Sequence, residues 1–246
     1  MGIGHVDLRG RIEPGVRRVR AYLGGALVVD TTAPSLVWEN SYYPTYYLPV
    51  ADVRAELVED GPGRDGGTVY TVRVDGAQAP GAALRHADSP VEELRDLVRL
   101  DWNAMDAWFE EDEEVFVHPR SPYTRVDVLP SSRNVRVEVD GVTVAESSSP
   151  RLLFETGLPV RYYLPKTHVR MDLLEHTDTI TRCPYKGDAE YWAVRAGGEV
   201  HKDLAWSYPT PLEESRNVAG LVCFYSEKVD IFVDGVKQDR PKTKFA

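Results

Sequence analysis

Cysteine, histidine and basic residues are scarce in this chain of 246 residues, and long apolar runs are absent. Two cysteines, Cys183 and Cys223, are too few for a disulfide scaffold. No stretch reaches the roughly 18 apolar residues of a membrane-spanning helix. The segment 1–10 has no apolar core, so we expect no secretory signal. The six histidines show no HxH or HExxH spacing and there is no CxxC pair, so we expect no metal site.

Positive charge is also in deficit. The chain has 29 Lys and Arg residues against 39 Asp and Glu residues, a formal net charge of −10. Nucleic acids and anionic membranes both attract basic surfaces, so we expect neither as a partner. The content of 42% hydrophobic and 28% charged residues is that of a globular protein. With so few cysteines, these values predict a soluble protein in the reducing cytoplasm.

What the chain does contain is an internal repeat. Shifted by 116 residues, segment 18–58 matches segment 134–174 without a gap, and 14 of 41 positions are identical. The longest shared run is Tyr-Tyr-Leu-Pro, at 46–49 and 162–165. Self-similarity of this length indicates a duplicated domain.

The repeat sets the expected domain boundaries. We expect an N-terminal extension over 1–15, a first repeat over 16–128, a linker over 129–132 and a second repeat over 133–246. The linker contains Pro130, which favours a turn. Later in the copies the shift becomes 121, and then returns to 116 where Val115-Phe-Val aligns with Ile231-Phe-Val.

Alternating residues predict mainly β structure. Runs of alternating apolar residues flank Asp140-Gly141, which predicts a hairpin with a type I′ turn, and Gly24-Gly25 takes the same place in the first repeat. Ser89-Pro90 and Thr210-Pro211 each precede a glutamate, a pattern typical of a helix start. We therefore expect a mainly β, minor α+β fold, with two tandem homologous domains that each pack one helix on an antiparallel sheet. The first helix would be the longer one, because apolar residues recur at helical spacing at Leu94, Leu97, Val98, Met105 and Trp108.

The second repeat resembles the domain of unknown function 427 (DUF427) family. The motifs that carry this resemblance are LFETGLP at 153–159, RYYLP at 161–165, RMD at 170–172, CPYKG at 183–187, AWSYP at 205–209 and AGLV at 219–222. The first repeat is similar to a divergent member, so the chain resembles a tandem form of the family. The resemblance implies a β-rich fold. A nucleotidyltransferase label is sometimes attached to the family, but this chain lacks both a Gly-Ser with paired aspartates and a glycine-rich phosphate loop.

Chemically distinctive residues occur in the second repeat alone. Cys183 and Lys186 have no counterpart in the first repeat, which has a polar glycine-rich loop at 61–67 instead. Arg161 is replaced by Thr45, and the segment 206–208, Trp-Ser-Tyr, by 85–87, Arg-His-Ala. A lysine near a cysteine stabilises the thiolate and makes it nucleophilic. The alternative interpretation is a buried cysteine with a solvated lysine.

We therefore place a candidate small-molecule site in the second repeat. Arg161 and Lys186 would bind an anionic group, and Tyr163, Trp206 and Tyr208 would wall the pocket. Cys183 would be the nucleophile, and Glu155 an acid/base or orienting group. Glu155 and its counterpart Glu39 lie among apolar neighbours and need cationic partners, for which the shared arginines Arg20/Arg136 and Arg54/Arg170 are candidates.

Two other functions remain open at this stage. The chain could be a non-catalytic binding or interaction module, because no complete catalytic constellation is visible. Nucleotide transfer would need carboxylates that converge on a metal, for which Asp172 and Asp188 are available. The sequence assigns no cofactor, does not decide whether the protein is an enzyme, and leaves the oligomeric state unknown.

Overall fold

The computed structural model describes residues 10–63 and 66–243. The expected N-terminal extension lies outside these residues up to position 9. The chain divides into two compact units that meet in sequence between Ser121 and Pro122. Each unit holds one copy of the repeat, and we describe each separately.

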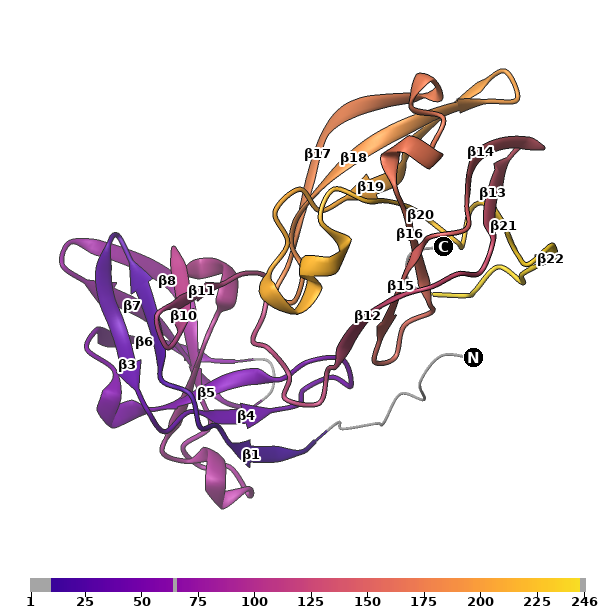
Figure 1. Ribbon diagram of the computed structural model, residues 1–246. Coiled ribbons are helices and arrows are strands. Elements are labelled where there is room, and N and C mark those ends of the chain that lie inside the picture. Colours follow the sequence, from indigo (N-terminus) through magenta and orange to yellow (C-terminus); the bar gives the residue numbers. More distant parts are fainter. Residues whose placement is uncertain (1–9, 64–65, 244–246) are drawn as a thin grey trace. The chain divides into compact units, whose positions relative to one another are not determined.

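The first repeat consists of two antiparallel sheets (Figure 1). The large sheet has seven strands, in the spatial order β1 (Ile12–Pro14), β4 (Ser35–Val37), β5 (Thr45–Pro49), β9 (Leu97–Leu100), β8 (Ala77–Arg85), β7 (Thr68–Val74) and β6 (Glu56–Pro62). The small sheet has four strands, in the order β11 (Glu113–Val115), β10 (Ala107–Glu110), β2 (Val19–Leu23) and β3 (Ala26–Thr31).

The second repeat has the same two sheets with the same strand order. Its large sheet runs β12 (Val126–Pro130), β15 (Arg151–Glu155), β16 (Arg161–Leu164), β20 (Val222–Phe224), β19 (Glu199–Ser207), β18 (Gly187–Ala196) and β17 (Leu174–Cys183). Its small sheet runs β14 (Val142–Ser147), β13 (Val135–Val139), β21 (Asp230–Val233) and β22 (Val236–Lys237). The mainly β, duplicated fold expected from the sequence is thus confirmed.

In each repeat the main core includes residues of both sheets. In the second repeat Val137 of β13 and Ile231 of β21 share a cluster with Val194 and Val222 of the large sheet. The corresponding cluster of the first repeat includes Trp108 of β10. Burial of these side chains removes apolar surface from water, which stabilises the fold by about 25 cal/mol per Å².

The opposite face of each large sheet, which we call the outer face, is also covered. Successive side chains of a strand point to opposite faces. Accordingly, Tyr162 packs against the main core, whereas Tyr163 belongs to a separate cluster with only 1% of its surface exposed. Tyr46 and Tyr47 divide in the same way in the first repeat. Both tyrosines of each pair are therefore placed against apolar neighbours.

The predicted hairpin turns are present. Asp140 and Gly141 join β13 to β14 with φ angles of 50° and 77°. Gly24 and Gly25 join β2 to β3 with φ angles of 60° and 78°. Two consecutive residues with positive φ define a type I′ turn, which explains why Asp-Gly and Gly-Gly occur here.

Each predicted helix is reduced to a short 3₁₀ segment, Glu92–Leu94 in the first repeat and Glu213–Val218 in the second. The described residues contain only short 3₁₀ segments, at Val50–Asp52, Glu92–Leu94, Trp102–Ala104, Lys166–His168, Met171–Leu173 and Glu213–Val218. None of these segments has the length and apolar character needed to cross a bilayer. Leu97 and Val98 lie in β9 and face opposite sides of the sheet, and Trp108 lies in β10. The apolar spacing that resembles a helix is produced by two short strands joined by a turn at Asp101, whose side chain accepts a hydrogen bond from the Asn103 amide.

The sequence boundaries of the repeats also shift. Leu129 and Pro130, expected in the linker, lie in β12 and pair with β15. Proline is tolerated there because β12 is an edge strand. Likewise β1, which falls in the expected N-terminal extension, pairs with β4.

The strand registers define which residues correspond between the repeats. Tyr47 pairs with Arg99, and Tyr163 pairs with Cys223, so Arg99 and Cys223 are counterparts. By the same criterion Trp206 corresponds to Leu84, one residue away from the position that the sequence comparison indicated.

The end of the sequence alignment was wrong as well. Ile231 corresponds to Trp108, not to Val115, because Ile231 pairs with Val137 as Trp108 pairs with Ala21. Loops of different length displace the shift between the copies, and the sequence alone does not reveal where.

Candidate functional site

The seven candidate residues gather in the second repeat. Six of them are less than a tenth exposed: Glu155, Arg161, Tyr163, Lys186, Trp206 and Tyr208. Cys183 is half-buried. The tyrosines and the tryptophan belong to a cluster on the outer face that we call the outer cluster, which comprises Val128, Leu153, Tyr163, Ala189, Tyr191, Trp206, Tyr208, Val218 and Cys223.

Cys183 and Lys186 bracket the turn between β17 and β18. The Lys186 amide donates to the Cys183 carbonyl at 3.3 Å, which closes the turn. The Lys186 carbonyl accepts from the Leu212 amide at 3.2 Å, and the Tyr185 carbonyl accepts from the Ser215 hydroxyl at 3.3 Å. The segment at 212–215 thus fixes the turn from outside the hairpin.

Lys186 forms a buried ion pair with Glu155. Its Nζ lies 2.5 Å from Glu155 Oε2, and both residues are less than a tenth exposed. Burial alone lowers the pKa of Lys186, but the Glu155 carboxylate and the Cys183 side chain outweigh this effect and raise it. Lys186 therefore carries a positive charge at neutral pH. The Glu155 carboxylate supplies the partner that a buried ammonium group requires.

Cys183 lies close to two further groups of the candidate set. Its side chain contributes to the raised pKa of Lys186. It also contributes, after burial, to the raised pKa of the Tyr208 hydroxyl. A thiol, an ammonium group and a neutral phenol are thus brought together where β17 ends, and the thiol is the most exposed of the three.

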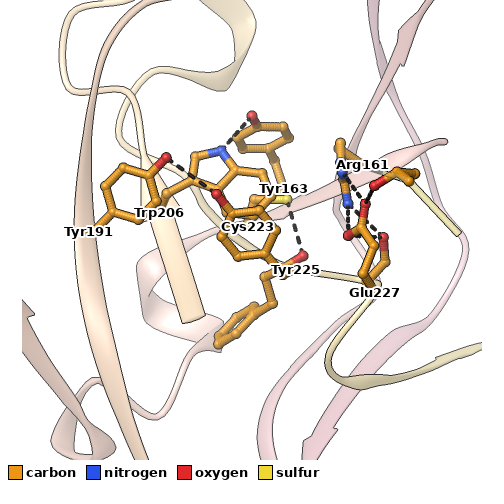
Figure 2. A network of polar contacts seen from close by, with 10 residues as sticks. Arg161, Tyr163, Tyr191, Trp206, Cys223, Tyr225 and Glu227 are labelled. Atoms are coloured by element: carbon orange, nitrogen blue, oxygen red, sulfur yellow. Dashed lines mark hydrogen bonds and ion pairs between the residues drawn. The ribbon is translucent and has the colours of Figure 1, made fainter. Parts of the chain in front are cut away.

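Arg161 is engaged by residues that the sequence did not single out. Its two terminal nitrogens donate to the two carboxylate oxygens of Glu227 at 2.6 Å each, and Nη1 also donates to Ser226 Oγ at 2.7 Å (Figure 2). The two side chains are 8% and 0% exposed. Burial raises the pKa of Glu227, but hydrogen bonds from Arg161 and Thr243 outweigh it, so the net pKa is lowered.

Hydrogen bonds between the polar groups of aromatic side chains fix the arrangement of the outer cluster. The Trp206 indole donates to the Tyr163 hydroxyl at 3.1 Å, with the two rings edge to face at 88°. The Tyr225 ring lies 4.6 Å from that of Trp206, and its hydroxyl is 3.4 Å from that of Tyr191 (Figure 2). Cys223 lies in this cluster without exposure, and burial raises its pKa to about 12. Cys223 is a core residue, as expected.

In the first repeat the equivalent glutamate pairs with an arginine instead of a lysine. Glu39, the counterpart of Glu155, accepts from Arg99 Nη1 at 3.0 and 3.2 Å and from the Tyr47 hydroxyl at 2.9 Å. The expected partners of the two glutamates were wrong. Arg20 pairs with Asp112 and Arg54 with Asp30, while Arg136 pairs with Glu138 and Arg170 with Asp172. Each of these four arginines pairs with a carboxylate on its own strand or turn or on a neighbouring one.

Sequence reasoning missed Glu227, Ser226, Tyr225 and Arg99. Arg99 could have been noticed, because it interrupts the apolar run at 97–100. For Glu227 the available signal is its position three residues after the apolar strand β20. Neither signal identifies a partner, because the pairs join segments that are 60 and 66 residues apart.

One group of metal-ligand types is brought together by the fold. Ligand atoms of Asp140, Glu199 and His201 lie within 4.8 Å of one another, where the β13–β14 and β18–β19 turns meet. His201 Nε2 lies 2.7 Å from Asp140 Oδ2, so these two groups already satisfy each other. Both carboxylate residues are exposed. These three residues are the ones that could hold a metal among those described, and their contacts are equally those of a surface ion pair.

A comparison with protein-family models identifies the family of each repeat. A family model for the domain of unknown function DUF427 covers residues 11–111 and again residues 127–235. One match lies within each structural unit, the first beginning just before β1 and the second within β12. No curated protein matches the chain.

Proposed function

Because the chain belongs to the DUF427 family in a tandem two-copy form, we propose that its second repeat binds a small anionic molecule at the β17–β18 turn. The observation that carries this proposal is that the Lys186 ammonium group contacts the Glu155 carboxylate in the turn that begins at the half-buried Cys183, a side chain that also contributes to the raised pKa of Lys186. An ammonium group has three N–H donors. The Glu155 carboxylate accepts from one of them, and an anionic ligand at the turn would accept from another.

In this proposal Cys183 is the candidate nucleophile. A cation next to a thiol favours the thiolate, which is the reactive form. Glu155 holds Lys186 in place through their 2.5 Å contact. Tyr208 walls the turn from the outer cluster. These groups support binding and thiol activation, and they assign no particular reaction.

In this proposal Arg161 supports the site and does not contact the anion directly. Its guanidinium group is held by Glu227 and lies 5.6 Å from the centre of the Trp206 ring. Binding a ligand anion directly would require Arg161 to leave a buried carboxylate, which is costly. We therefore assign Arg161, Tyr163 and Trp206 to the wall behind the turn, where they fix its shape.

Thiol reactivity tests the proposal. Labelling with iodoacetamide between pH 6 and 9, read by mass spectrometry, is expected to modify Cys183 and to spare the fully buried Cys223 as an internal control. Lys186→Gln is expected to slow Cys183 labelling several-fold, because the thiolate loses its cation. Lys166→Gln, which removes an exposed lysine of the same repeat, is the matched control. Acetate or phosphate should protect Cys183 from labelling.

A second candidate function is a non-catalytic interaction module. One observation favours it: Glu155–Lys186 and Arg161–Glu227 are complete ion pairs within the domain. If Cys183 reacts no faster than N-acetylcysteine and neither anion protects it, the binding proposal fails and the interaction module is the better account. Nucleotide transfer has less support, since Asp172 and Asp188 are each paired with a neighbouring arginine, Arg170 and Arg182.

A further inference from the structure

The first repeat has a hollow of its own, remote in sequence from the candidate residues of the second repeat. Its volume is about 210 Å³. Ligand pockets commonly measure about 300–1,000 Å³, so this hollow has room for a fragment-sized ligand rather than for a nucleotide. The lining comes from the loop before β5, from the loop after β9, and from residues 117–119.

Aromatic rings line much of the hollow. Trp102 stacks on Trp108 with ring centres 4.8 Å apart, and Tyr46 tilts against both rings at 6.4 and 6.0 Å. Tyr43 stacks on His118 with ring centres 3.9 Å apart. All five rings line the hollow. The face of an aromatic ring is electron-rich and attracts cations, most strongly for tryptophan.

The charges around the hollow also favour a cation. Arg99 lines it, but its guanidinium group is neutralised by two hydrogen bonds to Glu39. Asp101 lines it as well and adds a carboxylate. Residues 1–121 contain 12 Arg and no Lys against 21 Asp and Glu, whereas residues 122–246 contain 17 basic and 18 acidic residues. Nearly all of the net negative charge therefore belongs to the half of the chain with the hollow.

In the second repeat an arginine side chain occupies the position that corresponds to the hollow of the first repeat. Thr45, which lines the hollow, is the counterpart of Arg161, since these residues pair with Val37 and Leu153 at equivalent positions of the sheet. The Arg161 guanidinium group reaches the loop after β20, where it meets Ser226 and Glu227. In the first repeat the loop after β9 lines the hollow instead. Arg161 thus fills this place in the second repeat, whereas the first repeat has the shorter Thr45, whose hydroxyl donates to Glu39, and open space beside Arg99.

We propose that the hollow of the first repeat binds a small organic cation of the guanidinium type. The ligand would lie against the Trp102 and Tyr43 rings and face Asp101. In this way an external guanidinium group would take the place that Arg161 fills in the second repeat. The site is independent of the proposed anion site, because none of its residues belongs to the second repeat.

Titration of the full chain with methylguanidinium chloride tests this site. Tryptophan fluorescence and the indole signals of Trp102 and Trp108 in NMR spectra report on the hollow directly. We expect saturable binding with a dissociation constant on the order of 1 mM, as befits a ligand of few atoms. Tetramethylammonium should bind more weakly because it is not flat, and sodium benzoate should not bind.

Two variants locate the binding. Thr45→Arg fills the hollow with the side chain that the second repeat uses, and it should weaken methylguanidinium binding at least tenfold. Asp101→Asn should weaken it several-fold without added bulk, which keeps the test decisive if the first variant does not fold. Lys166→Gln, an exposed substitution in the second repeat, should leave it unchanged.

Three results would overturn the proposal. They are the absence of saturable binding to the native chain, preferential binding of benzoate, and binding that survives both first-repeat variants.

Discussion

Arg99 and Cys223 occupy the same register position in the two copies of one sheet, each directly opposite a tyrosine of the neighbouring strand. In the first repeat this position supplies the cation that pairs with Glu39. In the second repeat a thiol takes the position, and the cation for Glu155 comes from Lys186 in a turn. The glutamate is therefore present in both repeats, whereas its cationic partner lies in strand β9 in the first repeat and in the β17–β18 turn in the second.

This difference between the repeats predicts that substituting the two glutamates lowers the free energy of unfolding by unequal amounts. Glu155→Gln leaves the buried Lys186 ammonium group without a charge partner, and loss of one member of a buried pair costs about 3–5 kcal/mol. Glu39→Gln is the matched control, because the Glu39 and Arg99 side chains are 34% and 35% exposed. Exposed pairs contribute about 0–1 kcal/mol. Hydrogen exchange read on peptides of each repeat measures both effects, and equal losses would contradict the buried-pair interpretation.

Acid should destabilise the second repeat through Glu227. The pKa of Glu227 is lowered in the folded state, so its contribution to stability is complete above the unfolded pKa of about 4.3 and is lost as the pH falls through the folded value. Local hydrogen exchange at pH 7 and at lower pH, down to 3, should show this loss in peptides around Arg161. Glu227→Gln should be less stable at pH 7 and should lose less on acidification. An unchanged pH dependence in the variant would assign the acid sensitivity to other groups.

The hydroxyl of Tyr163 should matter more than that of Tyr162. Tyr163→Phe removes the acceptor of the buried Trp206 indole N–H, and an unsatisfied buried donor costs about 1–3 kcal/mol. Tyr162→Phe makes the same chemical change on the other face of β16 and should cost less. Urea unfolding of the full chain, followed by fluorescence, gives both values. A Tyr163→Phe variant as stable as the native chain would show that the indole finds another acceptor.

The turn between β18 and β19 offers a purely steric test. Gly197 and Gly198 both have positive φ, at 59° and 86°. A Cβ at Gly197 would lie 2.6 Å from Asp140 Cβ, whereas a Cβ at Gly198 would meet nothing within 4 Å. Both alanine variants incur the cost of left-handed backbone, about 1–2 kcal/mol. Gly197→Ala adds a clash, so its thermal midpoint should be clearly lower than that of Gly198→Ala.

Local patterns in the sequence predicted those features that depend on near neighbours. The type I′ turn at Asp140-Gly141 follows from the backbone demands of a two-residue hairpin. The separation of Tyr162 and Tyr163 onto opposite faces follows from the twofold period of a strand. The duplication itself required only self-comparison of the chain.

Features that depend on sheet register were not accessible from the sequence. Val98 and Trp108 fit a helical pattern, yet they are recruited into two strands of different sheets, because tertiary pairing overrides weak helix propensity. The ion pair between Glu155 and Lys186 was not predicted either, although both residues belong to the candidate site, because arginines were the expected partners of Glu155. The two residues are 31 positions apart, and the turn that carries Lys186 meets β15 only through the folded sheet.

The identical strand order of the two repeats creates a hazard during folding. Strands β1 and β12 occupy the same edge beside equivalent strands β4 and β15, so an exchange of strands between the copies is topologically allowed. Such misassembly is a known failure of repeated domains. Placing β9 into the second sheet would bring Arg99 opposite Tyr163, where Glu155, the counterpart of Glu39, is already paired with Lys186, so two buried cations would share one carboxylate. Divergence between the copies thus keeps each strand with its own sheet, a discrimination that the newly duplicated chain would have lacked.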